Sequence, residues 1–133
     1  VLDRFGRFGK PLQVTELDID VPDERLQADY LRDFMTACFS HPAVDGIILW
    51  EFWQGLKSGA PEAAVLFRED WSLKPGGAAW RDLVFKRWWT DVRGTSGADG
   101  RFQVRGFLGS YEVEALGRTA ALELTREGAA VKF

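Results

Sequence analysis

The apolar and polar positions in the first part of the chain follow two different spacings. Residues 11–19 form a short run of β-forming residues around two carboxylates, bounded by Gly9 and Pro22, which predicts a strand that ends in a functional loop. From Pro22 to Phe39 the apolar residues recur at helical spacing, and acidic residues occupy the first turn. This second segment is predicted to be an amphipathic helix, with an apolar face of Leu26, Tyr30, Phe34, Ala37 and Cys38.

A second strand and a second helix are predicted further along. Residues 46–53 (GIILWEFW) are an almost unbroken apolar run, typical of a strand buried on both faces of a parallel sheet. A helix is expected to begin near Pro75, with Ala79, Trp80, Leu83, Val84 and Trp88 on its inward face. Because two βα units cannot cover both faces of a parallel sheet, further units are expected upstream. A complete eight-unit barrel needs roughly 250 residues.

From about Thr90 the pattern changes to alternation interrupted by glycines. An Asp99-Gly100 pair is a hairpin signal, and the alternation predicts a small antiparallel sheet. We therefore divide the chain into residues 1–90, which carry the βα units, and residues 91–133, a β-rich extension. The alternating apolar positions of the extension are Phe102, Val104, Tyr111, Val113, Leu122, Leu124, Val131 and Phe133.

Composition narrows the classes of partner. Of the 133 residues, 46% are hydrophobic, so the chain can bury a core. Its net charge is −3, so no basic surface is expected that could hold nucleic acid. No apolar run approaches the roughly 20 residues of a membrane span, so no membrane partner is expected. The single cysteine, Cys38, is interpreted as a small core residue. One His and one Cys do not make a zinc site, and His41 is expected to cap a helix end rather than bind metal.

Glu16 is the candidate catalytic residue. It lies at the carboxyl end of the first predicted strand, and in βα barrels the catalytic groups gather at these ends. Retaining glycoside hydrolysis uses two carboxyl groups about 5 Å apart, one of which attacks the anomeric carbon. The spacing alone leaves open that Glu16 and Asp18 are solvated acids at a loop edge.

Two tryptophans that end the second predicted strand are candidates for sugar binding. The apolar face of a pyranose can stack on Trp50 or Trp53, although the residues alone favour core packing for both tryptophans. Glu51 lies between the aromatic residues, and strand alternation points it away from Trp50, so it is interpreted as structural.

These segments together resemble glycoside hydrolase family ten, the endo-β-1,4-xylanases. Residues 14–19 (VTELDI) are similar to the seventh barrel strand of that family and residues 46–53 to the eighth. The likeness continues through residues 64–71, 74–75 and 88–90, and then through a β-rich tail found in some members, here residues 99–102, 105–109 and 111–113. The resemblance implies an α/β fold: the C-terminal part of a (β/α)8 TIM barrel followed by a small antiparallel extension.

The resemblance also implies a function. The chain is expected to belong to a secreted or extracellular retaining endo-1,4-β-xylanase that cleaves internal bonds of xylan. Glu16 would be the nucleophile, and Trp50 and Trp53 would bind substrate. No metal or organic cofactor is expected. The expected partners are xylan or xylo-oligosaccharides and the N-terminal remainder of the same barrel.

Three departures from the family pattern qualify this expectation. The family's acid/base is a glutamate after an asparagine, and this chain contains no asparagine. The loop of residues 54–61 lacks a His-Trp pair frequent in relatives, and the histidine that steadies the nucleophile would precede Val1. The chain alone is therefore expected to be inactive. Two alternatives stay open: a non-catalytic carbohydrate-binding or interaction module, and a retaining barrel glycosidase acting on glucan or mannan.

Overall fold

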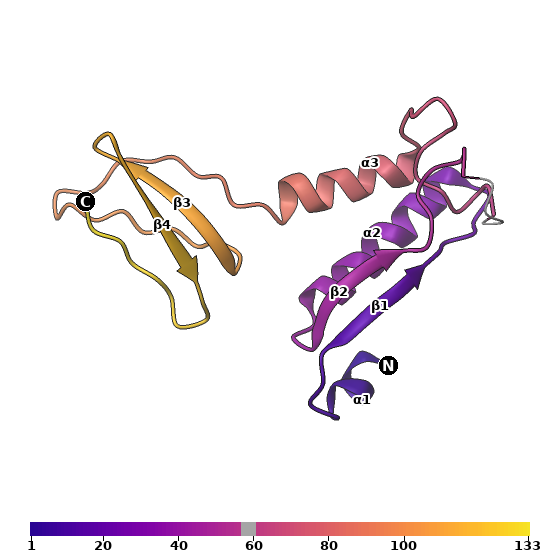
Figure 1. Ribbon diagram of the computed structural model, residues 1–133, viewed down its shortest axis with the longest axis horizontal. Coiled ribbons are helices and arrows are strands. Elements are labelled where there is room, and N and C mark those ends of the chain that lie inside the picture. Colours follow the sequence, from indigo (N-terminus) through magenta and orange to yellow (C-terminus); the bar gives the residue numbers. More distant parts are fainter. Residues whose placement is uncertain (57–60) are drawn as a thin grey trace. The chain divides into compact units, whose positions relative to one another are not determined.

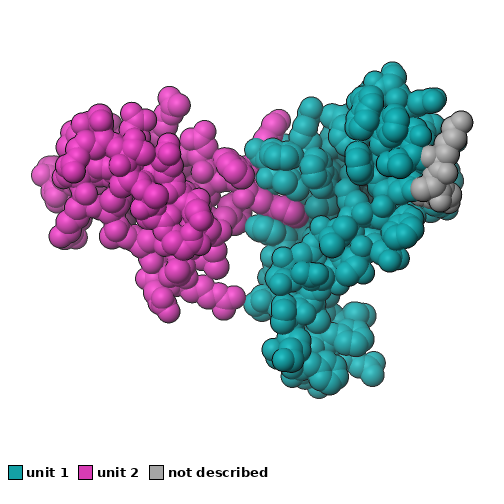
Figure 2. Space-filling view, in the orientation of Figure 1, with its two compact units in different colours: residues 1–85 teal, residues 86–133 magenta. Residues whose placement is uncertain are grey.

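The computed structural model describes residues 1–56 and 61–133. In chain order the elements are α1 (Leu2–Gly6), β1 (Leu12–Leu17), α2 (Glu24–Ser40), β2 (Val44–Leu49), α3 (Pro75–Asp82), the π-helix η1 (Leu83–Arg87), β3 (Gly109–Ala115) and β4 (Arg118–Leu124). Figure 1 shows these elements along the chain. The chain divides into two compact units, Val1–Phe85 and Lys86–Phe133, which are coloured separately in Figure 2. Among the described helices, none has the length and apolar character needed to cross a membrane.

The first unit is a β-α-β arrangement with the short helix α1 before it and helix α3 after it (Figure 1). Strands β1 and β2 pair in parallel, and α2, which connects them, packs on β2 and on α3. The predicted order of strand, helix, strand and helix is confirmed by β1, α2, β2 and α3. Two parallel neighbouring strands need a long crossover connection, and α2 provides it. The buried apolar residues of this unit are Leu17, Ile19, Leu31, Met35, Cys38, Ala64, Val65, Leu66 and Leu83.

Strand β2 differs from its prediction in length and burial. It ends at Leu49, and Trp53 instead forms an isolated bridge with Phe67. No residue of β2 is fully buried, and Ile48 is 53% exposed, so the expectation of burial on both faces is wrong for this chain. The reason is that β1 is the strand paired with β2 within the described residues, so the sheet is too narrow to be covered as a barrel sheet is.

Helix α2 buries a different stripe from the predicted one. Asp23 caps the helix by accepting hydrogen bonds from the backbone N–H groups of Arg25 and Leu26. The predicted apolar face is wrong for Leu26 and Tyr30, which are each 56% exposed, and for Ala37, which is also exposed. Cys38 is buried as predicted, and burial raises the pKa of its thiol. The buried stripe consists of Gln27, Leu31, Met35 and Cys38.

Helix α3 begins with Pro75 at its first turn, as predicted. Gly76 and Gly77 are buried at this helix start. A Cβ on Gly77 would lie 2.5 Å from the carbonyl oxygen of Leu66, so the close approach of helix and preceding segment requires glycine there. Of the predicted inward face, Leu83 is buried, whereas Ala79, Trp80, Val84 and Trp88 are only partly buried.

The second unit contains one β-hairpin. Strands β3 and β4 pair antiparallel from Gly109↔Leu124 to Ala115↔Arg118, and the turn residues Leu116 and Gly117 have φ values of 53° and 70°. Both central residues therefore have the positive φ that a two-residue type I′ hairpin turn requires.

The predicted sheet is larger than the observed one. The segments around Phe102 and Val104 and around Val131 and Phe133 are not strands, and the Asp99-Gly100 turn does not join a hairpin. Around Phe107, side chains satisfy the backbone instead: its N–H donates to Thr90 Oγ1 and its carbonyl accepts from the Tyr111 hydroxyl. The alternation of apolar and polar residues predicted strands around Val104 and Val131. It does not show whether a partner strand is available to pair with them.

Candidate active site

Glu16 lies at the carboxyl end of β1, within an irregularity of the strand pairing. Val14 pairs with Ile47 and Leu17 pairs with Leu49, so β1 has one more residue than β2 in this interval. Thr15 and Glu16 are consequently both exposed, where regular alternation would turn one of them inward. Such a bulge redirects a side chain, and here it leaves the Glu16 carboxylate open to solvent.

Trp50 lies at the same edge of the sheet as Glu16. Its backbone N–H donates to the carbonyl oxygen of Leu17 at 3.0 Å, which ties the residue after β2 to the residue after Glu16. The Trp50 side chain is 54% exposed. The structure therefore brings a solvent-accessible carboxylate and a half-exposed indole to the carboxyl ends of adjacent parallel strands.

Asp18 and Asp20 follow Glu16 on the segment that leaves β1. Partial burial raises the pKa of Asp18, and the negative charge of Asp20 raises this pKa further, against the lowering effect of the Ile19 backbone N–H. Asp18 thus holds a proton more readily than an ordinary aspartate does.

Trp53 belongs to a separate aromatic cluster with Phe52, Phe67 and Trp71. Its ring stacks on Trp71, with ring centres 4.7 Å apart and planes 12° apart, and its Nε1 donates to the carbonyl oxygen of Glu69. A Cβ on Gly55 would overlap the Trp53 ring, so this glycine permits the ring to fold against the chain. Trp53 is partly buried, and the ring that covers it is Trp71.

Sequence reasoning did not single out Trp71 as a binding residue. Trp71 has φ 66°, a conformation that bulky residues rarely adopt, and its side chain is 55% exposed. The turn that holds it is closed by Asp70, which accepts a hydrogen bond from the Ser72 N–H. The Glu-Asp-Trp-Ser sequence contains this turn signal, because aspartate side chains commonly bond the backbone two residues on.

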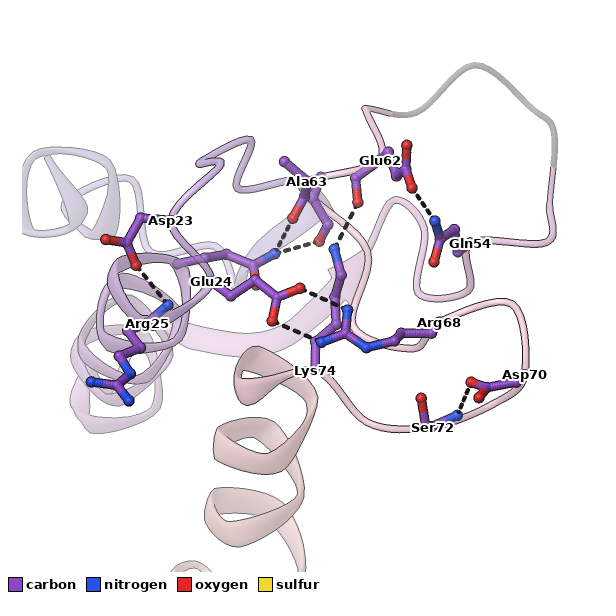
Figure 3. A network of polar contacts seen from close by, with 12 residues as sticks. Asp23, Glu24, Arg25, Gln54, Glu62, Ala63, Arg68, Asp70, Ser72 and Lys74 are labelled. Carbon is purple, nitrogen blue, oxygen red and sulfur yellow. Dashed lines mark hydrogen bonds and ion pairs between the residues drawn. The ribbon is translucent and has the colours of Figure 1, made fainter.

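A polar network fixes the loop that carries this cluster (Figure 3). Arg68 makes two parallel hydrogen bonds to Glu24 at the start of α2, at 2.7 Å and 2.8 Å. Buried Lys74 donates through Nζ to the carbonyl oxygen of Glu62, and Gln54 contacts the Glu62 carboxylate. The loop is thus attached to α2 through side chains rather than through a β-ladder.

The Glu24–Arg68 pair predicts a pH-dependent contribution to stability. The hydrogen bond from Arg68 holds the pKa of Glu24 below its usual range. A depressed pKa contributes stability above the unfolded value of about 4.3, and this contribution is lost as pH falls through the folded pKa. Glu24→Gln should therefore lower the melting temperature at neutral pH, with the difference from wild type shrinking below about pH 4.

The expected effect is modest because the Arg68 and Glu24 side chains are 41% and 35% exposed. Glu114→Gln on the exposed face of β3 is the matched control. A deficit of the Glu24 variant that stays constant from pH 7 to pH 3 would contradict this assignment.

His41 ends α2 through its backbone N–H, which donates to Cys38. Its ring does not bond the last carbonyls as predicted: Nδ1 accepts from the Ala43 N–H, and Nε2 lies 3.2 Å from Asp3 Oδ1. Pro42 cannot continue the helix, because proline has no backbone N–H to donate. In the part of the chain that the structure describes, no group of three or more His, Cys, Asp or Glu side chains is placed to hold a metal ion.

Comparison with known proteins defines the class. Residues 1–82 match Glycosyl hydrolase family 10, and the chain belongs to this family, which confirms the resemblance. Among curated relatives, endo-1,4-beta-xylanase 1 of Arabidopsis thaliana is 35% identical over 115 residues, covering 86% of this chain and 12% of the relative. The anti-sigma-I factor RsgI6 of Acetivibrio thermocellus is 33% identical over 113 residues, covering 85% of this chain and 15% of the relative.

Solved structures agree with this assignment. Xylanase 10B from Thermotoga petrophila RKU-1, in complex with xylobiose, matches with a TM-score of 0.54 and 27% identity, covering 65% of this chain and 30% of that one. The native xylanase 10B from Thermotoga maritima matches equally well. Together with the family, these neighbours imply that the chain includes part of a TIM barrel. The β1–β2 pair is the parallel sheet present in the described residues and is not itself a barrel.

Proposed function

We propose that the protein carrying this chain is a retaining endo-1,4-β-xylanase and that Glu16 is its nucleophile. The observation that carries the proposal is the bulge in β1, which leaves Glu16 exposed at the carboxyl edge of a parallel strand pair beside Trp50. A carboxylate in this position is accessible to a substrate lying across the strand ends. The chain spans 15% of the anti-sigma-I factor and 12% of the Arabidopsis xylanase. The proposed activity is therefore that of the complete polypeptide and not of residues 1–133 alone.

The proposed reaction has two displacements. A Glu16 carboxylate oxygen attacks the anomeric carbon while a general acid gives its proton to the departing glycosidic oxygen, so that one C–O bond forms as another breaks. The same acid/base then takes a proton from water, whose oxygen displaces Glu16 and restores the original configuration. The acid/base is placed outside this chain, because the asparagine that precedes it in the family pattern does not occur here.

The remaining parts of the proposal follow from this role. Residues 1–90 would supply C-terminal βα units of the barrel, and residues 91–133 a small β-rich extension. Trp50 would stack on a xylose ring next to Glu16. The N-terminal remainder of the barrel would complete the cleft, and no metal or organic cofactor enters either displacement. The protein would be secreted or extracellular, because xylan, its proposed substrate, is an extracellular polymer.

Product stereochemistry tests the proposal. The complete polypeptide should release oligosaccharides from xylan whose new reducing ends are initially in the β configuration, as followed by proton NMR before mutarotation. Residues 1–133 alone should release none, because one carboxylate without its partner provides no protonation. Initial α products would exclude retention, and no products from the complete polypeptide would exclude the enzyme assignment.

One observation favours a second candidate. A relative with 33% identity bears the name of a regulatory protein, an anti-sigma factor, rather than of a hydrolase. A carbohydrate-binding or interaction module is therefore the alternative. It predicts that the complete polypeptide binds xylan without cleaving it, and that Trp53→Ala reduces this binding.

A further inference from the structure

We propose that Trp71 is a sugar-stacking residue of this site, with Trp53 as the ring that supports it. The exposed face of the Trp71 indole would bind one pyranose ring of a xylo-oligosaccharide. This inference rests on the proposed function and adds a substrate-binding residue at the aromatic cluster.

The first argument is the backbone conformation of Trp71. Its φ of 66° lies in the left-handed region, which favours glycine and asparagine over a bulky side chain. Three hydrogen bonds enforce the turn: Arg68 N–H to the Ser72 carbonyl, Trp71 N–H to the Arg68 carbonyl, and Ser72 N–H to Asp70 Oδ1, each 2.9 Å. A residue held so firmly in an unfavourable conformation is a candidate for a functional position.

The second argument is which ring faces remain free. The Trp53–Trp71 stack covers one face of each ring, and Gly55 lies directly against the Trp53 ring. The Trp53 Nε1 is bonded to the Glu69 carbonyl oxygen, which fixes the orientation of that indole. Phe67 and Phe52 pack beside Trp71 with ring centres 6.0 Å and 6.4 Å away. Trp71 is the most exposed residue of the cluster, at 55%, against 43% for Phe52, whereas Trp53 and Phe67 are only partly exposed.

The third argument concerns the ligand. A xylose ring has apolar faces and a rim of hydroxyl groups, so a rigid, flat indole with polar groups around it suits this ring. The exposed side chains of Glu69 and Asp70 precede Trp71 and supply carboxylate acceptors for hydroxyl groups. The cluster also follows the carboxyl end of β2, the strand whose end carries Trp50.

The test compares two substitutions in the complete polypeptide. Trp71→Asn removes the ring but tolerates the left-handed backbone, whereas Trp71→Phe retains an aromatic face. With xylo-oligosaccharides of two to six units, Trp71→Asn should raise KM about tenfold for those long enough to reach the ring, with kcat within about twofold. Trp71→Phe should recover most of the affinity. Trp89→Asn, at an indole that is 65% exposed and outside the cluster, is the matched control.

The outcomes separate this inference from the proposed function. If the wild-type polypeptide cleaves none of these sugars, the proposed function fails, whether or not it binds them. If the wild type cleaves them and Trp71→Asn has an unchanged KM at every length, only the role of Trp71 fails. That role also fails if Trp71→Asn lowers the melting temperature without changing KM, since the ring would then pack against another part of the polypeptide.

Discussion

Replacement of Glu16 by alanine is expected to reduce xylan hydrolysis by the complete polypeptide at least about 10³-fold, through kcat. The variant is expected to keep the strand pairing and the aromatic residues, because Glu16 is exposed on β1. What it loses is the oxygen that forms the glycosyl-enzyme bond. Initial rates on xylohexaose, with binding measured separately by calorimetry, distinguish this loss from a loss of affinity.

Rescue by a small anion separates a nucleophile from a structural carboxylate. Azide can occupy the space left by the Glu16 side chain and displace an activated leaving group, which forms an α-glycosyl azide instead of a β product. Glu51→Gln is the control, because Glu51 is interpreted as structural and should retain most of the activity. Full activity of Glu16→Ala, or a cleavage defect in Glu51→Gln as large as that in Glu16→Ala, would remove Glu16 from the nucleophile role.

Part of the environment of Glu16 could be predicted from the sequence, and part of it could not. The β-forming residues and the flanking Gly9 and Pro22 predicted a strand across residues 11–19, and β1 spans Leu12–Leu17. They could not predict the extra residue of β1 between the Val14–Ile47 and Leu17–Leu49 pairs, because a bulge is a property of two paired strands. The exposure of Glu16 therefore depends on information that a single strand sequence does not contain.

The orientation of α2 required contacts that are distant in sequence. Apolar residues occur on two adjacent stripes of this helix, so periodicity was satisfied by Leu26 and Tyr30 as well as by Leu31 and Met35. The buried stripe is selected by Gln27, whose amide nitrogen donates to the carbonyl oxygens of Ala63 and Ala64 at 2.7 Å and 2.9 Å. A buried glutamine is not recognisable from a helical pattern, because its partners lie in a separate loop.

Trp71 was missed for a related reason. Its turn belongs to neither helix nor strand, and its stacking partner Trp53 is adjacent in space but remote in sequence. Conversely, the alternation of Phe102 and Val104 with polar residues predicted a strand that the structure does not have. Local patterns thus located the regular elements, and non-local contacts decided which faces and loops form the site.

Gln27→Glu is expected to destabilise the fold strongly at neutral pH. Gln27 is 1% exposed, and its Nε2 faces three backbone carbonyls, those of Ile19, Ala63 and Ala64. The substitution preserves shape but places an anion against these oxygens in a buried position. The expected loss in the free energy of unfolding is about 3–5 kcal/mol at pH 7, measured by urea unfolding.

The pH dependence of this loss identifies its cause. Burial raises the folded-state pKa of the introduced carboxyl, so the destabilisation is complete above that pKa and diminishes as pH falls toward the unfolded value of about 4.3. The protonated carboxyl can then donate one hydrogen bond to a facing carbonyl. The control, Gln103→Glu at an exposed position, should change stability by less than about 0.5 kcal/mol. A loss in Gln27→Glu that does not diminish toward pH 4 would mean that altered packing, rather than a buried charge, causes the destabilisation.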